Sequence, residues 1–593
     1  MLRLFVQAQG SGVVVKLEGR VSTSSSSGGQ LTTSFENDPQ LPFSKLTLTL
    51  NGGPWAPLAN PQTCGTFSAT SDLVPWSAPI TPDATPSNAV QIEGCGSPQP
   101  FAPGFSAGSA SSAAGAFAPF GLTLSRADGE QDLSAIQVST PPGLLGMLSK
   151  VQLCPEPQAA SGACGPQSLI GHSQVAVGAG PDPFWVGGEV FLTGPYGGGP
   201  FGLSVVTHAK AGPYDLGEVV VRAAVSVNPT TSAITVTSGP FPQILDGVPL
   251  RIRTVQVTID REGFMLNPTS CRTQEVLGKV ASTQQAVASV ASKFTASRCS
   301  ELPFKPVLTA SAQGQGSKAD GTRFSVKIDS QGLGQANVAK VDLQLPKALP
   351  TRIETLQKAC LQAVFEANPA ACDAGSMIGT AIVHTPILDN PLVGPAYLVS
   401  HGGAAFPDVE FVLQGEGVTL ILDGKTDIKH GITYSRFESA PDAPFTTFET
   451  TFPAGPHSAL TANVAERKNH DLCGERLQMP TTITGQNGKV VKQNTKIAVN
   501  KCPIQVIGRK VVGNEAVLTV ETYSAGRVSG SGKNLNTVAR HFNSAEKKAT
   551  IRVPLSSGGK SKGRPFTANV RVGFFPKKKG APTSVAHVNV VFR

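Results

Sequence analysis

Charged residues are scarce in this chain. Asp, Glu, Lys and Arg make up 15% of its 593 residues, against ~25% in ordinary soluble domains, which excludes the charge-rich composition of disordered chains. No run approaches the ~18 consecutive apolar residues of a membrane helix, so no transmembrane segment is expected. The opening residues, Met1-Leu-Arg-Leu-Phe-Val6, also lack the basic region, apolar region and cleavage site of a signal peptide.

Glycine and proline are abundant instead, with 63 and 47 copies. They punctuate short alternating runs of Val, Thr and Ser, a pattern typical of strands and turns. A chain of this length exceeds one hydrophobic core and should contain three to six domains at ~100–200 residues each. The composition therefore predicts an all-β protein built from several domains.

The ten cysteines form a repeating pattern. Three pairs are separated by 31, 28 and 29 positions and two by 10 and 12, and equivalent pairs recur about every 205 residues. This periodicity predicts five sequential disulfides: Cys64–Cys95, Cys154–Cys164, Cys271–Cys299, Cys360–Cys372 and Cys473–Cys502. A zinc site is disfavoured, because no Cys-x-x-Cys occurs and no His recurs with the cysteines. Disulfides persist in oxidising compartments, so an extracellular or cell-surface location is expected.

Other residues repeat in step with the cysteines. Phe5-Val-Gln-Ala-Gln-Gly10 near the start mirrors Phe411-Val-Leu-Gln-Gly415, and Pro100-Phe101 opens one unit as Pro303-Phe304 opens the next. Residue 1 consequently falls inside a repeat. We expect the chain to be N-terminally incomplete, with a signal peptide lost from the missing part.

The repeat divides the chain into four parts. Residues 1–99 are the back half of a unit, and 100–302 and 303–502 are full units, each long enough for two Ig-like β-sandwich lobes. Residues 503–593 are predicted to form one further Ig-like sandwich. A short helix is expected near 351–366, where apolar residues fall on one helical face. Lys279–Ala296 contains residues with high helix propensity, but it aligns with a hairpin strand after Gln486-Asn-Gly488, which favours a strand there.

The C-terminal part carries the basic excess of the chain. It holds sixteen Lys and Arg against three Glu, a net charge of +13, whereas residues 1–502 sum to −4. Such a surface could attract an anionic cell-wall polymer or glycan through a salt-dependent field, or it could simply keep strand edges from pairing with other chains. Nucleic acid is not an expected partner, since aromatic residues are not interleaved with the basic ones. The candidate binding residues are Lys560, Lys562, Arg564, Lys577, Lys578 and Lys579.

Motifs for chemistry are weak. Gly104-Phe-Ser-Ala-Gly108 fits the nucleophile elbow of hydrolases, but the aligned Val307-Leu-Thr-Ala-Ser311 loses both glycines and no helix is predicted to follow. Ser529-Gly-Ser-Gly-Lys533 fails the spacing of a phosphate loop and reads as a hairpin turn. Asp423 and Asp427 lack the oxygen-dense loop that calcium needs. The histidines do not align between units. Those within the two full units are His172, His208, His384, His401, His430, His457 and His470, seven of the nine in the chain. We expect no catalytic residue, no cofactor and no metal.

A family resemblance adds to this interpretation. Phe117-Ala-Pro-Phe120, the run Leu392–Pro407 and Pro480-Thr-Thr-Ile-Thr-Gly-Gln-Asn-Gly488 resemble uncharacterised secreted repeat proteins of high-GC actinobacteria, over most of residues 1–502. The segment Ala525–Leu535 resembles a small Ig-like module often placed at the C-terminal end of such proteins. The resemblance implies an extracellular β-rich surface protein and transfers no activity.

Three functions remain open on this basis. The first is a non-enzymatic surface stalk or scaffold with lobes stacked end to end. The second is an adhesin or glycan-binding protein, and the third, an enzyme, has only Ser106 of the elbow-like motif in its favour. Contacts to a glycan would come from exposed aromatic residues. The candidates are Trp55, Trp76, Phe184, Trp185 and Tyr196.

Overall fold

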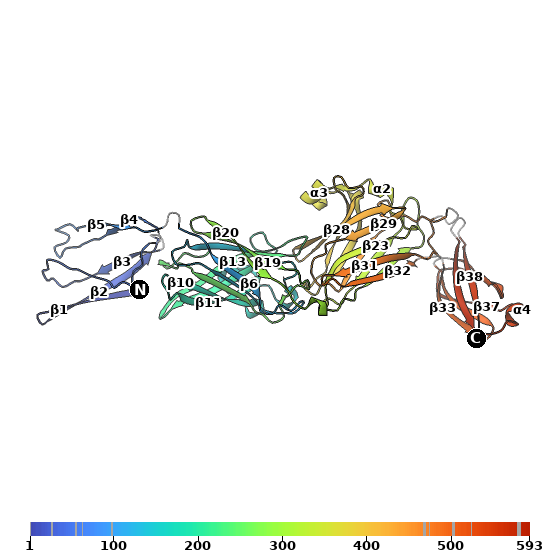
Figure 1. Cartoon of the computed structure of the whole chain (residues 1–593), viewed down its shortest axis with the longest axis horizontal. Coiled ribbons are helices and arrows are strands. Elements are labelled where there is room, and N and C mark those ends of the chain that lie inside the picture. Colours follow the sequence, from blue (N-terminus) through green and yellow to red (C-terminus); the bar gives the residue numbers. More distant parts are fainter. Residues whose placement is uncertain are drawn as a thin grey trace.

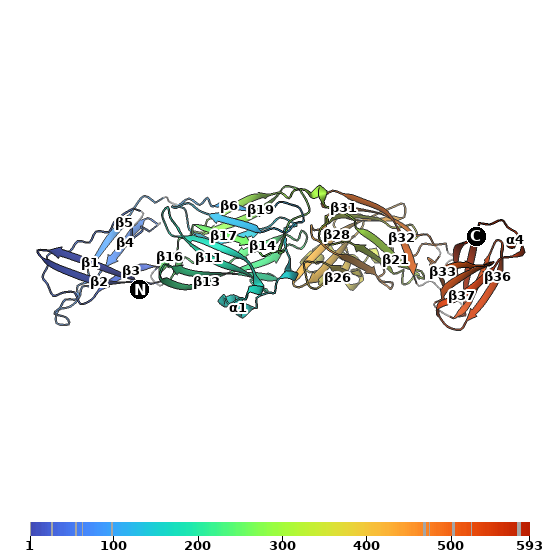
Figure 2. The same cartoon turned by 90° about the horizontal axis from the view of Figure 1, so that it is seen from below.

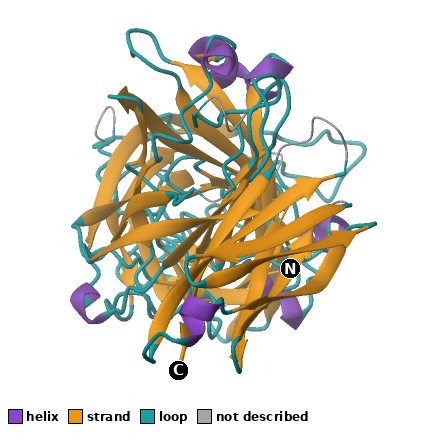
Figure 3. Ribbon diagram, turned by 90° about the vertical axis from the view of Figure 1, so that its right-hand side faces the viewer, coloured by secondary structure: helices purple, strands orange, loops and turns teal. Residues whose placement is uncertain are grey.

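The computed structural model describes residues 2–24, 28–53, 56–61, 63–95, 99–465, 470–473, 475–500, 504–522, 525–577 and 583–593. Its strands gather into four modules that follow one another in line from the N-terminus to the C-terminus (Figure 1, Figure 2). Figure 3, which looks along the long axis, shows that strands dominate and that the few helices are short. The predicted all-β class is confirmed. No helix of the described residues is long and apolar enough to cross a membrane.

The first full unit forms one sheet of eleven strands, which we call the first ring. The strand order is β20-β19-β8-β14-β13-β12-β11-β10-β17-β7-β6. The end strands β6 and β20 lie side by side, since the Ser292 hydroxyl donates to the Ala107 carbonyl at 2.9 Å. The strands are β6 (Gly104–Ser109), β7 (Phe120–Ser125), β8 (Leu133–Ser139), β10 (Leu169–Val177), β11 (Phe184–Thr193), β12 (Phe201–Ala211), β13 (Tyr214–Val227), β14 (Ile234–Ser238), β17 (Thr254–Ile259), β19 (Gln274–Ser282) and β20 (Val287–Phe294).

The second full unit forms the second ring, with the same order of equivalent strands. Here β26 pairs with both β25 and β27, and β21 pairs in parallel with β32, so the ring is closed by hydrogen bonds. The strands are β21 (Val307–Gln313), β22 (Phe324–Asp329), β23 (Val338–Gln344), β24 (Cys360–Leu361), β25 (Met377–His384), β26 (Leu392–Ser400), β27 (Asp408–Gly415), β28 (Val418–Lys429), β29 (Ile432–Phe437), β30 (Thr447–Phe452), β31 (Gln478–Gly485) and β32 (Val490–Asn500).

Alternation of apolar and polar residues explains the rings. In β22, Phe324, Val326 and Ile328 are buried while their neighbours are half-buried, because successive side chains point to opposite faces of a sheet. The structure joins the two lobes expected in each unit into this one sheet. In the first ring β8, from the front half of the unit, pairs with β14 and β19 from the back half.

Helices cover only short stretches outside the rings. The helix expected near 351–366 is present as two pieces, α2 (Ile353–Leu356) and α3 (Gln362–Ala367), because Cys360 and Leu361 between them form β24 and pair with β26. The equivalent loop of the first unit contains α1 (Glu156–Ser161), which was not expected. Residues 279–296 form the hairpin β19–β20, as predicted.

Four of the five expected disulfides join described residues. They are Cys64–Cys95, Cys154–Cys164, Cys271–Cys299 and Cys360–Cys372. Cys473 is also disulfide-bonded, and Cys502, its expected partner, lies outside the described residues. The covalent loops follow the pairing that the repeat predicts wherever both cysteines are described.

The described residues of the N-terminal half-unit (2–24, 28–53, 56–61 and 63–95) form five strands. Strands β1 (Leu2–Gly10), β2 (Val13–Ser24) and β3 (Gln30–Phe35) form one small sheet, and β4 (Gly65–Thr70) pairs with β5 (Ser87–Ile92) in another. Large apolar side chains such as Phe5, Phe43 and Ile80 are exposed in this half-unit. The half-unit contacts the first ring through the Thr23 hydroxyl, which donates to the Asp246 carbonyl at 2.6 Å.

The C-terminal module is a two-sheet sandwich, as predicted for this part. One sheet has the order β33-β34-β37 and the other β36-β35-β38-β39. Their facing side chains form a separate core that includes Leu518, Val570 and Phe574. The strands are β33 (Ile504–Val512), β34 (Glu515–Thr522), β35 (Gly526–Gly532), β36 (Leu535–Phe542), β37 (Glu546–Pro554), β38 (Phe566–Pro576) and β39 (Ser584–Phe592), with α4 (Ser557–Lys560) between β37 and β38.

Candidate functional site

A buried polar contact lies at the junction between the two full units. Asp442 lies in the loop between β29 and β30 of the second unit and is almost fully buried. Its carboxylate accepts hydrogen bonds from the Thr269 amide at 2.8 Å, the Thr269 hydroxyl at 2.6 Å and the Ser270 amide at 3.0 Å, all in the first unit. Asn337 of the second unit donates a fourth bond at 2.8 Å. We call these four residues the Asp442 latch.

Burial and hydrogen bonding have opposite effects on the pKa of the Asp442 carboxyl. Burial raises the pKa of the Asp442 carboxyl, and the hydrogen bonds from Thr269, Asn337 and Ser270 act against that rise. Each of the four donors would be left without an acceptor if the carboxylate were removed. The latch therefore ties the orientation of one unit to that of the next.

Backbone bonds strengthen the same junction. The Ser149 amide donates to the Ile387 carbonyl at 2.9 Å, and the Ile421 amide donates to the Pro229 carbonyl at 2.8 Å. Both bonds join the first unit to the second. The two rings are thus fixed to each other by main chain as well as by side chains.

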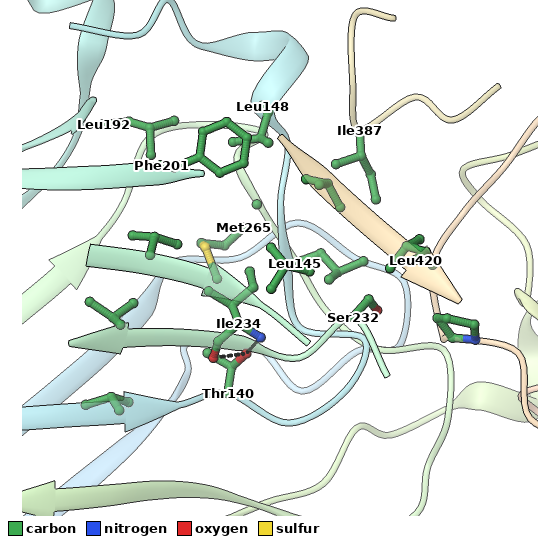
Figure 4. A pocket seen from close by; sticks show the side chains of 18 of the residues that line it. Thr140, Leu145, Leu148, Leu192, Phe201, Ser232, Ile234, Met265, Ile387 and Leu420 are labelled. Carbon is green, nitrogen blue, oxygen red and sulfur yellow. Dashed lines mark hydrogen bonds between the residues drawn. The ribbon is translucent and has the colours of Figure 1, made fainter. Parts of the chain in front are cut away.

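An apolar cavity of about 770 Å³ occupies the interior of both rings and passes through the junction. Figure 4 shows its middle part, where Leu145, Leu148 and Met265 of the first unit lie opposite Ile387 and Leu420 of the second. The Ile234 amide donates to the Thr140 hydroxyl at 3.1 Å, so this polar group of the wall is satisfied. Among the described residues of the lining, Lys210 alone is charged. Such a cavity suits an apolar occupant.

A second polar cluster lies on the outer face of the second ring. Val409, Phe411 and Leu413 of β27 line the cavity, so the alternating residues Asp408 and Glu410 face outward. The imidazole Nε2 of His401 is 3.5 Å from Oε1 of Glu410 and 3.6 Å from Oδ2 of Asp408. Asp423 of the neighbouring β28 completes the group. We call His401, Asp408, Glu410 and Asp423 the acidic cluster.

Charges of one sign dominate the acidic cluster. Burial, together with the charges of Asp423, Asp408 and Glu366, raises the pKa of Glu410 to about 8. Burial and the Asp408 charge also raise the pKa of Asp423. Asp408 is stabilised locally, because it accepts a hydrogen bond from the Thr426 amide at 3.0 Å.

The sequence did not connect these residues. Asp423 was considered beside Asp427 as a calcium candidate, whereas in the structure Asp427 forms an ion pair with Lys429. The partners of Asp423 are His401, directly after β26, and Glu410, on β27, and they come together only through the register of β26, β27 and β28. The signal that could have found them is two acidic residues spaced by two, Asp408 and Glu410, in an otherwise apolar strand.

The basic residues of the C-terminal module are only partly free. Lys560, at the end of α4, and Lys577 are exposed. The Lys562 ammonium lies 5.1 Å from the ring centre of Phe566. The Arg564 guanidinium donates to the Arg593 carbonyl at 3.1 Å, so part of its hydrogen-bonding capacity is used within the module. Lys578 and Lys579 lie outside the described residues.

The aromatic residues predicted to contact a glycan are spread over two modules of the described chain. Trp76 belongs to the N-terminal half-unit and is exposed, while Trp55 lies outside the described residues. Phe184 and Trp185 open β11 and are about half exposed. Tyr196 carries the guanidinium of Arg222 on its ring at 4.2 Å from the centre, so it has a partner within the chain.

The motif-like sequences form ordinary strands and turns. Ser106 lies in the middle of β6 opposite Thr123, and β7 follows without an intervening helix, so the strand–turn–helix of a nucleophile elbow is absent from this described stretch. Ser529–Gly532 belongs to β35, and a turn through Asn534 leads into β36. The hairpin interpretation of residues 529–533 is confirmed.

Comparisons with known proteins find likenesses in structure only. No protein family matches the sequence, and no curated protein matches it. The MSCRAMM ACE of Enterococcus faecalis, described as binding its ligands by the collagen hug model, aligns over 67% of this chain and 95% of its own at 10% identity, with a TM-score of 0.16. The B domain of a biofilm associated protein aligns over 67% and 83% at 9% identity, with a TM-score of 0.14.

A tetra-tandem repeat from the extending region of a large adhesion protein aligns over 82% of this chain and 99% of its own, at 9% identity and a TM-score of 0.13. TM-scores of this size carry no argument about fold or function. The functional conclusions below therefore depend on the geometry of this chain.

Proposed function

We propose that this chain is a non-enzymatic extracellular surface protein that acts as a stalk or scaffold. The observation that carries the proposal is the end-to-end junction of the two rings. The buried Asp442 latch and two backbone hydrogen bonds fix that junction in one geometry. The in-line order of all four modules extends the same arrangement (Figure 1).

The disulfides support an extracellular location. Four bridges close loops in three different modules, and bridges of this kind persist in oxidising compartments. The scarcity of charge and the absence of an elbow geometry around Ser106 favour a structural role over hydrolysis.

Small-angle X-ray scattering of the full chain tests the stalk. A rod of in-line modules should give a skewed distance distribution with a long tail, and the radius of gyration should exceed the ~25 Å expected for a compact globule of this length. A symmetric distribution near the compact value would contradict the proposal. Measuring at several protein concentrations separates this shape from self-association.

The cavity favours a second function, the binding of an apolar ligand such as an acyl chain. A volume of about 770 Å³ lies within the range of ligand pockets, and the lining is almost wholly apolar. A fluorescent fatty acid is a suitable probe. Leu420→Trp should fill the cavity at the junction and weaken binding about tenfold or more. Leu277→Trp, on an exposed outer position of β19, is the matched control. Equal affinity in both variants and the parent would count against an apolar ligand.

A further inference from the structure

The acidic cluster contains polar atoms that the chain itself does not satisfy. Glu410 is 5% exposed, and its Oε2 and the Nε2 of His401 are buried without a hydrogen-bond partner in the described structure. The ligand atoms of His401, Glu410 and Asp423 all lie within 4.8 Å of one another. Buried polar atoms are nearly always paired, so these two atoms and the adjacent carboxylate oxygens require an explanation.

The register of the strands identifies the position in the first ring that is equivalent to the acidic cluster. In the first ring Cys154 bridges to Thr193 in parallel, and in the second Cys360 pairs with Val399 in parallel. Thr193 is therefore equivalent to Val399. Both cysteines start the short disulfide loop that carries a helix over the outer face of the sheet, α1 in one unit and α3 in the other.

Two residue pairs further along the strands from Thr193 and Val399, the same register leads to the acidic cluster. Ser204 pairs with Arg222 in the first ring, and Glu410 pairs with Asp423 in the second. The first ring thus places a serine and an arginine where the second ring places two carboxylates. One unit carries a fixed positive charge at this position, and the other carries negative charge.

The Arg222 guanidinium is held as a cation on the first ring. It makes two bonds to the carboxylate of Glu156 on α1, at 2.8 and 3.0 Å. It also donates to the Thr193 hydroxyl at 3.3 Å and lies over the Tyr196 ring. In the second ring the equivalent helix α3 adds another carboxylate, Glu366, whose charge acts on Glu410. The charge of Lys425 also acts on Asp423, after that of His401, and Lys425 already pairs with Glu438 at 3.5 Å.

We propose that His401, Glu410 and Asp423 bind a divalent cation of the zinc class, with Asp408 beside it. The ion takes in the second ring the place that the Arg222 guanidinium takes in the first. It gives a partner to the unsatisfied Nε2 of His401 and Oε2 of Glu410, and it supplies a positive charge beside three carboxyl groups.

The donor set decides the class of ion. One imidazole nitrogen with carboxylate oxygens is typical of zinc and similar transition metals, whereas calcium takes six to eight oxygen ligands. Zinc usually takes four ligands, so His401, Glu410 and Asp423 would leave one position for Asp408 or water. The described cysteines are all in disulfides, so no thiolate competes for the ion there.

Isothermal titration of the chelator-treated full chain with zinc chloride tests the site. We expect one ion per chain, with affinity reduced at least tenfold in Glu410→Gln and in His401→Ala. His172→Ala is the matched control, because it removes an exposed histidine that lies 3.0 Å from Asp260 and should leave affinity unchanged. Absence of binding to the parent chain, undiminished affinity in both cluster variants, or binding of calcium in preference to zinc would overturn the proposal.

Asp423→Arg provides an independent test, because it places in the second ring the arginine that the first ring has at the equivalent position, Arg222. The metal-free variant should melt at a higher temperature than the metal-free parent, because the guanidinium replaces the missing cation. Zinc should raise the melting temperature of the parent and leave that of the variant unchanged. A variant that is no more stable than the parent and still gains from zinc would show that the position does not need a cation.

Discussion

The ionisation of Glu410 should be visible in the stability of the metal-free chain. Its ordinary pKa of 4.5 is raised to about 8 in the folded state, first by burial and then by the neighbouring acidic charges. Below pH 4.5 the carboxyl is protonated in both states and contributes nothing. Between pH 4.5 and 8 the unfolded chain releases this proton and the folded chain keeps it, so the free energy of unfolding falls as the pH rises.

Glu410→Gln removes this titration. With chelator present, the variant should gain stability over the parent as the pH rises from 5 to 8, by at least about 1 kcal/mol. Urea denaturation at several pH values measures the difference. Glu416→Gln, a change at an exposed position after β27, serves as the control and should show no such trend. A constant difference between parent and Glu410→Gln over this range would contradict the prediction.

Single residues show where sequence-based prediction stops. The cysteine pairs follow from spacing alone, because the repeat assigns each cysteine its partner along the chain. His401, Glu410 and Asp423 could not be grouped in this way, since they lie on or beside three strands whose register is a tertiary property. The role of Asp442 at the junction could not be predicted either, because its partners Thr269 and Ser270 belong to another unit.

At the scale of elements, the short disulfide loops hold helices against the outer faces of the rings. Cys154–Cys164 closes the loop that carries α1, from which Glu156 reaches Arg222. Replacing both cysteines by serine should lower the stability of the first ring by about 3 kcal/mol, from loop-closure entropy. Limited proteolysis within residues 155–168 and thermal unfolding report the effect. The double variant at Cys64 and Cys95, in the N-terminal half-unit, should leave the ring transition unaltered.

The Asp442 loop is an element with a similar role between units. Asp442→Ala should reduce the free energy of unfolding of the two rings by at least about 2 kcal/mol, because it leaves buried amide and hydroxyl donors without an acceptor. Asp427→Ala, which removes only a surface ion pair on the same ring, should change it much less. Guanidinium denaturation measures both. Equal effects would mean that the latch is energetically no more than a surface contact.

The order of the strands along the chain was easier to predict than their pairing within the sheets. Alternating residues located strands and the hairpin at 279–296, but local pattern cannot tell two stacked lobes from one ring, since both bury the same faces. The pairing of β8 with β14 and β19 decides between them, and it joins residues as far apart in the sequence as Leu133 and Ser282. The helix near 351–366 was interrupted for a similar reason, because the pairing of Cys360 with Val399 outweighs local helix preference.

At the scale of the whole molecule, charge is separated along the long axis. The C-terminal module carries a net charge of +13 while residues 1–502 sum to −4, and that module lies at one end of the in-line arrangement (Figure 2). A cationic end on a nearly neutral stalk could attach the chain to anionic polymers of a cell wall. The attraction would be screened as salt is added, since the Debye length falls from ~10 Å at 0.1 M to ~3 Å at 1 M.

Removing residues 503–593 should therefore reduce retention on isolated cell envelopes severalfold at low salt and have little effect at 1 M salt. The double variant Lys560→Glu and Lys577→Glu should reproduce part of the loss, because both ammonium groups are exposed. Arg564→Gln should have a smaller effect on retention, since its guanidinium is engaged by the Arg593 carbonyl. Retention that is independent of salt, or unchanged by the double charge reversal, would leave the basic surface as a device that keeps strand edges from pairing with other chains.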